Sequence, residues 1–277
     1  MPDIDEQRES ELMSKDANYV MLGDANTWYA AYGAGRPLVL LHPGGVGVDS
    51  RAFGSLLDTL SSRFRVYTPD RRAHGCTADT DGPFTYEMMA DDTAAFLKTV
   101  VGDSAHVLGY SDGAVVALLT ALRHRELVDH LVLVAGVFHR DGWLPGVLAS
   151  DEKEPPEFLV ASYAEVSPDG RDHAAVVARK LAQLHAHGPT LTADDLGRVK
   201  ARTLVMVADD DEVALEHAVA MYRGISNAEL AVVPGCSHGL LVEKPEMCSK
   251  GIVAFLTRDP IATIAPIRRA PGETSAP

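Results

Sequence analysis

The chain has 277 residues, 46% of them hydrophobic, and a net charge of −14. An acidic surface repels phosphate backbones, so nucleic acid is not an expected partner. No apolar run reaches the roughly 18 residues that span a bilayer, so we expect no membrane span. The acidic N-terminus lacks the pattern of a secretory signal, which favours the cytosol. Three scattered cysteines predict neither a disulfide framework nor a zinc site.

Apolar runs bounded by turn residues alternate along the chain with stretches of helical periodicity. The apolar runs cover residues 36–43, 63–70, 104–111, 129–136, 201–210 and 228–235. Helical spacing covers residues 50–62, 85–102, 112–124, 214–225 and 240–257. Continuous apolar runs are typical of strands covered on both faces, so the alternation predicts an α/β domain with a mostly parallel sheet. Two runs near the start, NYVMLGD and NTWYAAYG, would add an antiparallel hairpin at one edge.

Residues 137–199 interrupt this alternation, because they contain no good strand and only two helical patches, near 156–165 and 172–187. We therefore expect a core formed by residues 17–136 and 200–258, with 137–199 inserted as a helical cap. Residues 1–16 and 259–277 have little periodicity and are expected to be flexible tails.

The cap contains aromatic and histidine side chains that could line a substrate pocket. The candidates are Phe138, His139, Trp143 and Tyr163. The alternative is that most of them form the small core of a helical hairpin.

Ser111 is the candidate nucleophile, in the sequence GYSDG between a predicted strand and a predicted helix. A bend this tight strains the backbone at the serine and requires small neighbours, which Gly109 and Gly113 provide. The start of the following helix adds free N–H groups and a partial positive charge near the hydroxyl. A structural turn would use the same residues, but the position between strand and helix favours a nucleophile.

A serine hydroxyl needs a base, and the base needs an orienting carboxylate. His238 follows the last predicted strand and is the best-placed base. Asp211 follows the strand at 201–210 and is the favoured acid, with Asp210 as its main rival. The carboxyl ends of parallel strands meet at one edge of a sheet, so all three side chains are expected there.

The loop LLHPGGVGVDS, after the strand at 36–43, is the candidate anion site. Backbone N–H groups of Gly44 or Gly45, together with that of Asp112, would bind an oxyanion. A phosphate-binding loop is the competing interpretation, but the third glycine and the Gly-Lys-Ser/Thr of such loops are missing. The Asp112 side chain could repel acidic substrates or attract amines, or simply favour the start of a helix.

Taken together, LLHPGG, YTPDRRAHGCT, GYSDGA, VMVADDDEV and PGCSHGL resemble the α/β-hydrolase superfamily, in the family's order, over roughly residues 25–257. The resemblance implies an eight-stranded, mostly parallel sheet with flanking helices and a helical cap after the sixth strand. Pro43 departs from the usual His-Gly, which could shift one anion donor by a residue. A serine nucleophile argues against the dehalogenase and epoxide hydrolase branches.

The expected activity is hydrolysis of a carboxylic ester or lactone of a small apolar or natural-product substrate through a Ser-His-Asp acyl-enzyme mechanism, without a metal or organic cofactor. The same residues could instead cleave a C–C, thioester or amide bond, or carry out perhydrolysis. A third hypothesis is a ligand-binding protein on the same fold, because such proteins can retain an intact triad. The sequence leaves the oligomeric state and the physiological substrate open.

Overall fold

The computed structural model describes residues 17–148 and 154–258, so the predicted tails at 1–16 and 259–277 lie outside the described residues. Eight strands form one sheet in the order β1-β2-β4-β3-β5-β6-β7-β8. The strands are β1 (Asn18–Leu22), β2 (Ala25–Tyr32), β3 (Arg36–Leu41), β4 (Phe64–Pro69), β5 (Ala105–Tyr110), β6 (Val128–Val134), β7 (Arg202–Asp210) and β8 (Ala228–Ser237).

The sheet is parallel except at the edge formed by the N-terminal hairpin. β1 pairs antiparallel with β2, and β2 pairs antiparallel with β4, whereas all other neighbouring strands run parallel. β3 and β5 are buried almost throughout, because helices cover both faces of the sheet. The predicted eight-stranded α/β-hydrolase fold is therefore confirmed.

Helices pack on both faces of the sheet and form two hydrophobic cores. One face carries α2 (Gly54–Ser61), which is preceded by the 3-10 turn Ser50–Phe53, together with α9 (Leu240–Glu243) and α10 (Pro245–Thr257). The other face carries α3 (Tyr86–Phe96), α4 (Asp112–Arg123) and α8 (Leu215–Gly224). In α4, the ten residues from Gly113 to Leu122 are all buried, since the helix lies between the sheet and α3.

Two predicted helices differ locally from the sequence interpretation. The helix expected at 240–257 is divided into α9 and α10, because Pro245 cannot donate a backbone hydrogen bond and begins a new helix instead. The helix expected at 85–102 ends its α-helical part at Phe96 and continues as a π-helical turn, Leu97–Val101, which Gly102 closes with a positive φ.

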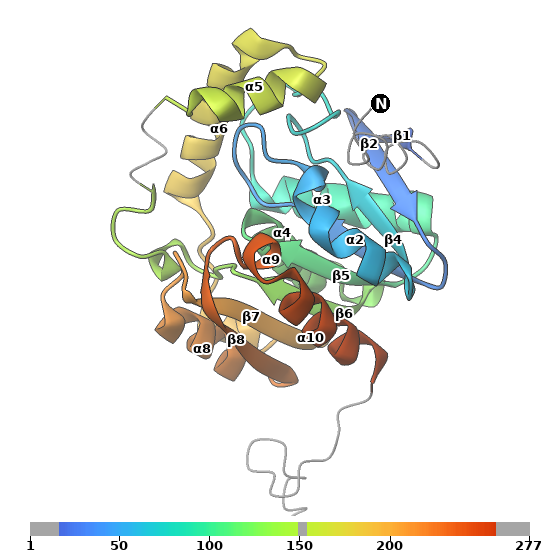
Figure 1. Cartoon of the computed structure of the whole chain (residues 1–277), viewed down its shortest axis with the longest axis vertical. Helices are drawn as coiled ribbons and strands as arrows, with labels where there is room; N and C mark the ends of the chain where they lie inside the picture. The colour runs from blue at the N-terminus through green and yellow to red at the C-terminus, as the bar shows by residue number, and fades with distance from the viewer. Residues whose placement is uncertain (1–16, 149–153, 259–277) are drawn as a thin grey trace, which may run out of the picture.

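The segment between β6 and β7 holds α5 (Glu157–Val166), α6 (Ala174–His187) and α7 (Ala193–Leu196). In its described part it contributes no strand to the sheet, only the isolated bridges His139↔Thr190 and Trp143↔Val213. Figure 1 shows α5 and α6 lying together at one end of the molecule, beyond the end of the sheet. Residues 137–199, called the cap segment below, have the position expected for a cap; the division into core and cap stays a prediction.

Candidate active site

Ser111 lies in a sharp bend between β5 and α4, with φ 55° and ψ −120°. This strained conformation is imposed by its surroundings, since the Ser111 N–H donates to the carbonyl of Val134 at 2.8 Å. A Cβ on Gly109 would lie 2.0 Å from the carbonyl oxygen of Gly113, and one on Gly113 would lie 2.0 Å from that of Leu41. Both flanking glycines are therefore required for helix α4 to approach the sheet this closely.

His238 and Asp211 meet Ser111 at the carboxyl edge of the sheet. The Nε2 atom of His238 lies 3.0 Å from the Ser111 Oγ, and its Nδ1 lies 2.7 Å from the Asp211 Oδ1. The buried Asp211 carboxylate also accepts hydrogen bonds from the backbone N–H groups of Ala208 and Val213. The rival Asp210 is exposed and lies opposite Ser237 in the register of β7 and β8. The structure thus brings the favoured three side chains together.

The electrostatics of His238 suit a general base. Burial alone would lower its pKa, but the hydrogen bond and charge of Asp211, with a further contribution from Glu212, outweigh burial and raise the pKa above its ordinary value of 6.5. The Glu212 carboxylate lies 4.0 Å from the Nε2 of His238 and is half exposed. Tyr110 fixes the histidine loop, because its hydroxyl donates to the His238 carbonyl at 2.5 Å.

Gly44, Gly45 and Asp112 line the same pocket as Ser111. Asp112 is the first residue of α4, where backbone N–H groups lack intrahelical partners. Gly44 touches Asp112 directly, since a Cβ on Gly44 would lie 1.9 Å from the Asp112 Oδ2. The predicted donors are therefore close together beside the hydroxyl, and their role in binding an oxyanion stays a prediction.

Arg71 fixes the loop after β3 that contains Gly44 and Gly45, called the glycine loop below. Its guanidinium donates to the carbonyls of His42 and Pro43 at 2.8 and 2.9 Å, and its backbone N–H donates to the Nε2 of His42 at 3.0 Å. Burial, with the nearby charge of Arg71, holds the pKa of His42 well below its ordinary value, so the imidazole is a neutral acceptor. This network joins the loop after β3 to the loop after β4.

The Asp112 side chain is buried and has partners from two helices. Its Oδ1 accepts from the Tyr86 hydroxyl of α3 at 2.7 Å, and its Oδ2 lies 3.0 Å from the Nε2 of His185 in α6. Burial favours the neutral acid, but His185, Arg71 and Tyr86 outweigh it, so the pKa of Asp112 lies below its ordinary value. Asp112 therefore does more than begin a helix: it joins the core to the cap segment as a buried carboxylate.

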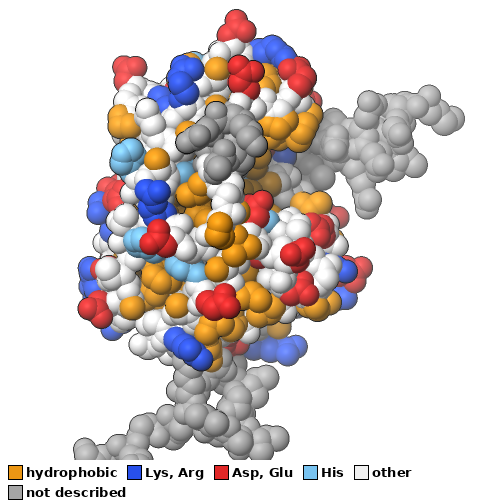
Figure 2. Space-filling model, turned by 90° about the vertical axis from the view of Figure 1, so that its left-hand side faces the viewer, with side chains coloured by type: hydrophobic (Ala, Val, Ile, Leu, Met, Phe, Trp, Pro, Cys, Tyr) orange, Lys and Arg blue, Asp and Glu red, His pale blue; other side chains and the backbone are white. Residues whose placement is uncertain are grey.

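A pocket of about 410 Å³ opens above Ser111. Its remaining lining is mostly apolar and comes from the glycine loop, the 3-10 turn after it, the cap segment and α9: Pro43, Val48, Ala52, Trp143, Val147, Leu148 and Val242. Figure 2 shows one face of the molecule, on which hydrophobic side chains gather across the middle with acidic ones between them. The described lining contains no lysine or arginine, so the pocket suits an uncharged or cationic ligand better than an anionic one.

Of the four pocket candidates in the cap segment, only Trp143 lines this pocket; its ring lies 5.8 Å from that of His238. The other three are not among its lining residues. The Phe138 ring stacks on that of His217, with the ring centroids 4.0 Å apart, and this contact fixes its position. His139 caps a short turn by accepting from the Asp141 N–H. Tyr163 is a core residue of α5, 1% exposed.

Three residues beside the site were not among the predicted site residues, although His185 belongs to the aromatic and histidine content expected of the cap. His185 and Tyr86 come from helices far from the GYSDG motif, and only their contact with Asp112 reveals them. Glu212 directly follows Asp211 and ends a run of four acidic residues. Its position next to the predicted acid is the one feature of the sequence that could have indicated it.

The sequence model of the family described as "Alpha/beta hydrolase family" matches residues 38–249, so the chain belongs to the α/β-hydrolase family. A 2-hydroxy-6-oxo-6-(2'-aminophenyl)hexa-2,4-dienoic acid hydrolase of Metapseudomonas resinovorans is 26% identical, over 92% of this chain and 94% of that protein. A pimeloyl-[acyl-carrier protein] methyl ester esterase of Aeromonas hydrophila is 32% identical, over 60% of this chain and 68% of that protein. These relatives are hydrolases.

A solved structure of a serine hydrolase involved in carbazole degradation superimposes with a TM-score of 0.72 at 25% identity, over 87% of this chain and 98% of that one. An enol-lactonase from Burkholderia xenovorans has the same fold, with a TM-score of 0.70 at 20% identity over 87% and 100%. Within residues 17–148 and 154–258, no helix has both the length and the hydrophobicity to cross a membrane.

Proposed function

We propose that this protein is a serine hydrolase that cleaves an uncharged, largely apolar carboxylic ester or lactone. The observation that supports this most strongly is the continuous chain of contacts from the Ser111 Oγ through His238 to the buried Asp211. In that arrangement a base can take the hydroxyl proton, and a carboxylate fixes the tautomer of the base and stabilises its cation.

The proposed reaction has two halves. His238 Nε2 takes the proton of Ser111 as its Oγ attacks the carbonyl carbon, and N–H groups of Asp112 and of Gly44 or Gly45 bind the resulting oxyanion. The tetrahedral intermediate collapses, His238 protonates the leaving alkoxide, and an acyl-serine remains. Water, deprotonated by His238, then attacks the acyl carbon, and Ser111 regains its proton as the acid is released.

The charge of the pocket supports an uncharged substrate. Asp112 and Glu212 both line the pocket, and the described lining has only histidines as potential cations. A carboxylate close to the scissile bond would be repelled by both acids. The apolar lining supplied by Trp143, Val147 and Leu148 favours an acyl group of several carbons, because its burial contributes about 0.8 kcal/mol per methylene.

Cleavage of a C–C bond is the second candidate, because one relative is named for a 6-oxo-hexa-2,4-dienoic acid, a compound that has no ester or amide bond to hydrolyse. The Metapseudomonas relative is a hydrolase of a hexa-2,4-dienoic acid, and the carbazole-pathway hydrolase shares its fold with this chain. Such a substrate carries a carboxylate, which the two acids around Ser111 disfavour.

The test is a panel of p-nitrophenyl acetate, p-nitrophenyl butyrate, uncharged lactones, thioesters and an anionic dienoate, with product masses recorded. Parent protein and Ser111→Ala are compared, and Ser62→Ala, at an exposed serine, is the matched control. We expect butyrate hydrolysis and fluorophosphonate labelling in the parent and the control, and loss of both in Ser111→Ala, with turnover reduced about 10⁶-fold. Turnover of the dienoate alone would support the second candidate. Absence of both labelling and turnover in the parent would contradict an enzyme and favour a ligand-binding protein.

A further inference from the structure

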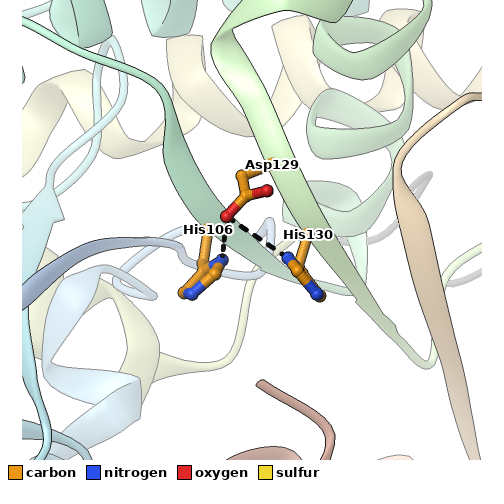
Figure 3. A group of neighbouring side chains, drawn as sticks. All are labelled: His106, Asp129 and His130. Atoms are coloured by element: carbon orange, nitrogen blue, oxygen red, sulfur yellow. Dashed lines mark ion pairs between the residues drawn. The ribbon is translucent and has the colours of Figure 1, made fainter. Parts of the chain in front are cut away.

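His106, Asp129 and His130 form a cluster at the amino-terminal side of the sheet, on β5 and β6 (Figure 3). His106 precedes Ser111 by five residues along β5, which places it about 16 Å from the hydroxyl at roughly 3.3 Å per residue. The cluster therefore lies at the end of the strands opposite the candidate active site, and the proposed hydrolysis does not use it.

A register shift between β5 and β6 creates this cluster. Ala105 is opposite Val128, and Val107 is opposite Leu131, so His106 alone faces both Asp129 and His130. In a regular strand, consecutive side chains point to opposite faces, whereas an extra residue in one strand re-aims a side chain. In Figure 3 the Asp129 carboxylate points between the two imidazole rings, and dashed lines join one of its oxygens to His106 and to His130.

The histidines of this cluster lack hydrogen-bond partners. His106 is 1% exposed, and neither of its ring nitrogens has a partner; the Nδ1 of His130 has none either. Buried polar atoms are nearly always hydrogen-bonded, so an orphaned ring indicates a missing ligand. Both unpartnered Nδ1 atoms face the same oxygen, the Asp129 Oδ2, at 3.3 Å each.

These separations match the coordination of zinc. A tetrahedral ion with ligands at 2.0–2.1 Å holds its ligand atoms about 3.3–3.4 Å apart. The two nitrogen–oxygen separations already have this value, and all ligand atoms of the cluster lie within 4.8 Å of one another. We propose that His106, Asp129 and His130 bind a divalent transition-metal ion of the zinc class, which joins β5 to β6 and leaves one position for water.

The cluster is accessible to an ion from solvent, and the Arg36 guanidinium would compete with that ion for Asp129. The side chains of Asp129 and His130 are 29% and 22% exposed, so the cluster is open to solvent on one side. The Arg36 guanidinium lies 2.5 Å from the Asp129 Oδ2 and occupies the carboxylate when no ion is bound. Because the Arg36 side chain is 67% exposed, it can turn into solvent without breaking the core.

The test is Zn²⁺ binding to the full-length chain, measured by competition with a chromophoric chelator, with Co²⁺ absorption as a report of geometry. The parent is expected to bind one equivalent more than His106→Gln, and its bound Co²⁺ is expected to give the intense visible bands of a tetrahedral site. His187→Gln, at an exposed histidine of α6, is the matched control and keeps that equivalent. Zn²⁺ is expected to raise the unfolding midpoint of the parent and the control but not that of His106→Gln.

Arg36→Gln provides the sharpest comparison, since it removes only the competing cation. We expect Zn²⁺ to bind about 1.5- to fivefold more tightly to this variant than to the parent, the size of an exposed ion pair. If His106→Gln fails to fold, His130→Gln replaces it, because that side chain is partly exposed. Equal Zn²⁺ stoichiometry in the parent and both cluster variants, or an affinity that does not rise in Arg36→Gln, would overturn the proposal.

Discussion

The carboxyl edge of the sheet and the cap segment contribute to one pocket in different ways. At the sheet edge, the three residues proposed for chemistry have their positions fixed by backbone hydrogen bonds, such as those from Ala208 and Val213 to Asp211. The cap segment supplies Trp143, Val147, Leu148 and His185 to the pocket, and the Nε2 of His185 lies 3.0 Å from the Oδ2 of Asp112, the residue after Ser111. We therefore expect substitutions at the sheet edge to change mainly kcat, and substitutions in the cap segment to change mainly KM.

After Ser111→Ala, the largest effect at the sheet edge is expected for Asp211→Asn. An amide at this position would hold His238 in the wrong tautomer and could not stabilise its cation, so kcat should fall about 10⁴-fold. The measurement is steady-state hydrolysis of p-nitrophenyl butyrate, with circular dichroism to verify folding.

Asp210→Asn is the matched control for that variant, because Asp210 is the adjacent, exposed carboxylate. Its kcat should stay within about twofold of the parent, as expected for a surface change. Equal losses in both variants would mean that the turn, rather than the Asp211 carboxylate, supports the reaction.

A smaller loss is expected when the proposed anion site is disturbed. In Gly44→Ala the new methyl group would meet the Asp112 carboxylate at 1.9 Å and displace the glycine loop. Losing one oxyanion donor lowers turnover roughly 10²–10³-fold, and we expect that range in kcat with a smaller change in KM. Gly54→Ala is the control, since nothing lies within 4 Å of a Cβ there; a normal kcat in Gly44→Ala would remove Gly44 from the mechanism.

The sequence allowed the sheet edge to be predicted because local patterns specify it. The motif GYSDGA specifies the strand end, the tight bend and the helix start. Gly109 allows a close contact with Gly113, and Gly113 allows one with Leu41 of the neighbouring strand β3. The end of the strand at 201–210 limits the candidate acids to Asp211, which the sequence favours, and Asp210. The structure decides between them, because the Asp211 carboxylate lies 2.7 Å from His238. The alternation of side chains between the two faces of a strand does not settle which aspartate turns toward His238, because the end of β7 is irregular.

The cap segment was predicted less well, since its side chains are placed by long-range packing. Phe138, His139 and Tyr163 have the right composition for a pocket, but stacking on His217, a turn cap and a place in the core determine their positions. The His106 cluster was also invisible in the sequence, because it arises from a register shift between two strands.

The pH dependence of turnover should report the charge around His238. The proposed base must be neutral, and its pKa is raised above 6.5 by Asp211 despite burial. The kcat/KM of the parent should therefore fall about tenfold per pH unit on the acid side, with a midpoint above 6.5. In Asp211→Asn that midpoint should move to lower pH, because the carboxylate that stabilises the His238 cation is gone. An unchanged midpoint would mean that a group other than His238 causes the loss of activity at low pH.

The smallest effect is expected in the cap segment, for His185→Gln. The change removes one of the two partners of the Asp112 carboxylate and alters the pocket wall, while Ser111, His238 and Asp211 keep their contacts. KM for p-nitrophenyl butyrate should rise by about three- to tenfold, within the range of a typical intramolecular hydrogen bond, with kcat within about twofold.

His187→Gln is the control for this variant, two residues further along α6 and exposed, and both of its constants should be those of the parent. A fall in kcat comparable with that of Gly44→Ala would show that His185 acts on the reacting atoms through Asp112. In that case the division between a sheet edge that controls turnover and a cap segment that controls binding would be wrong, because a side chain of α6 would belong to the reacting centre.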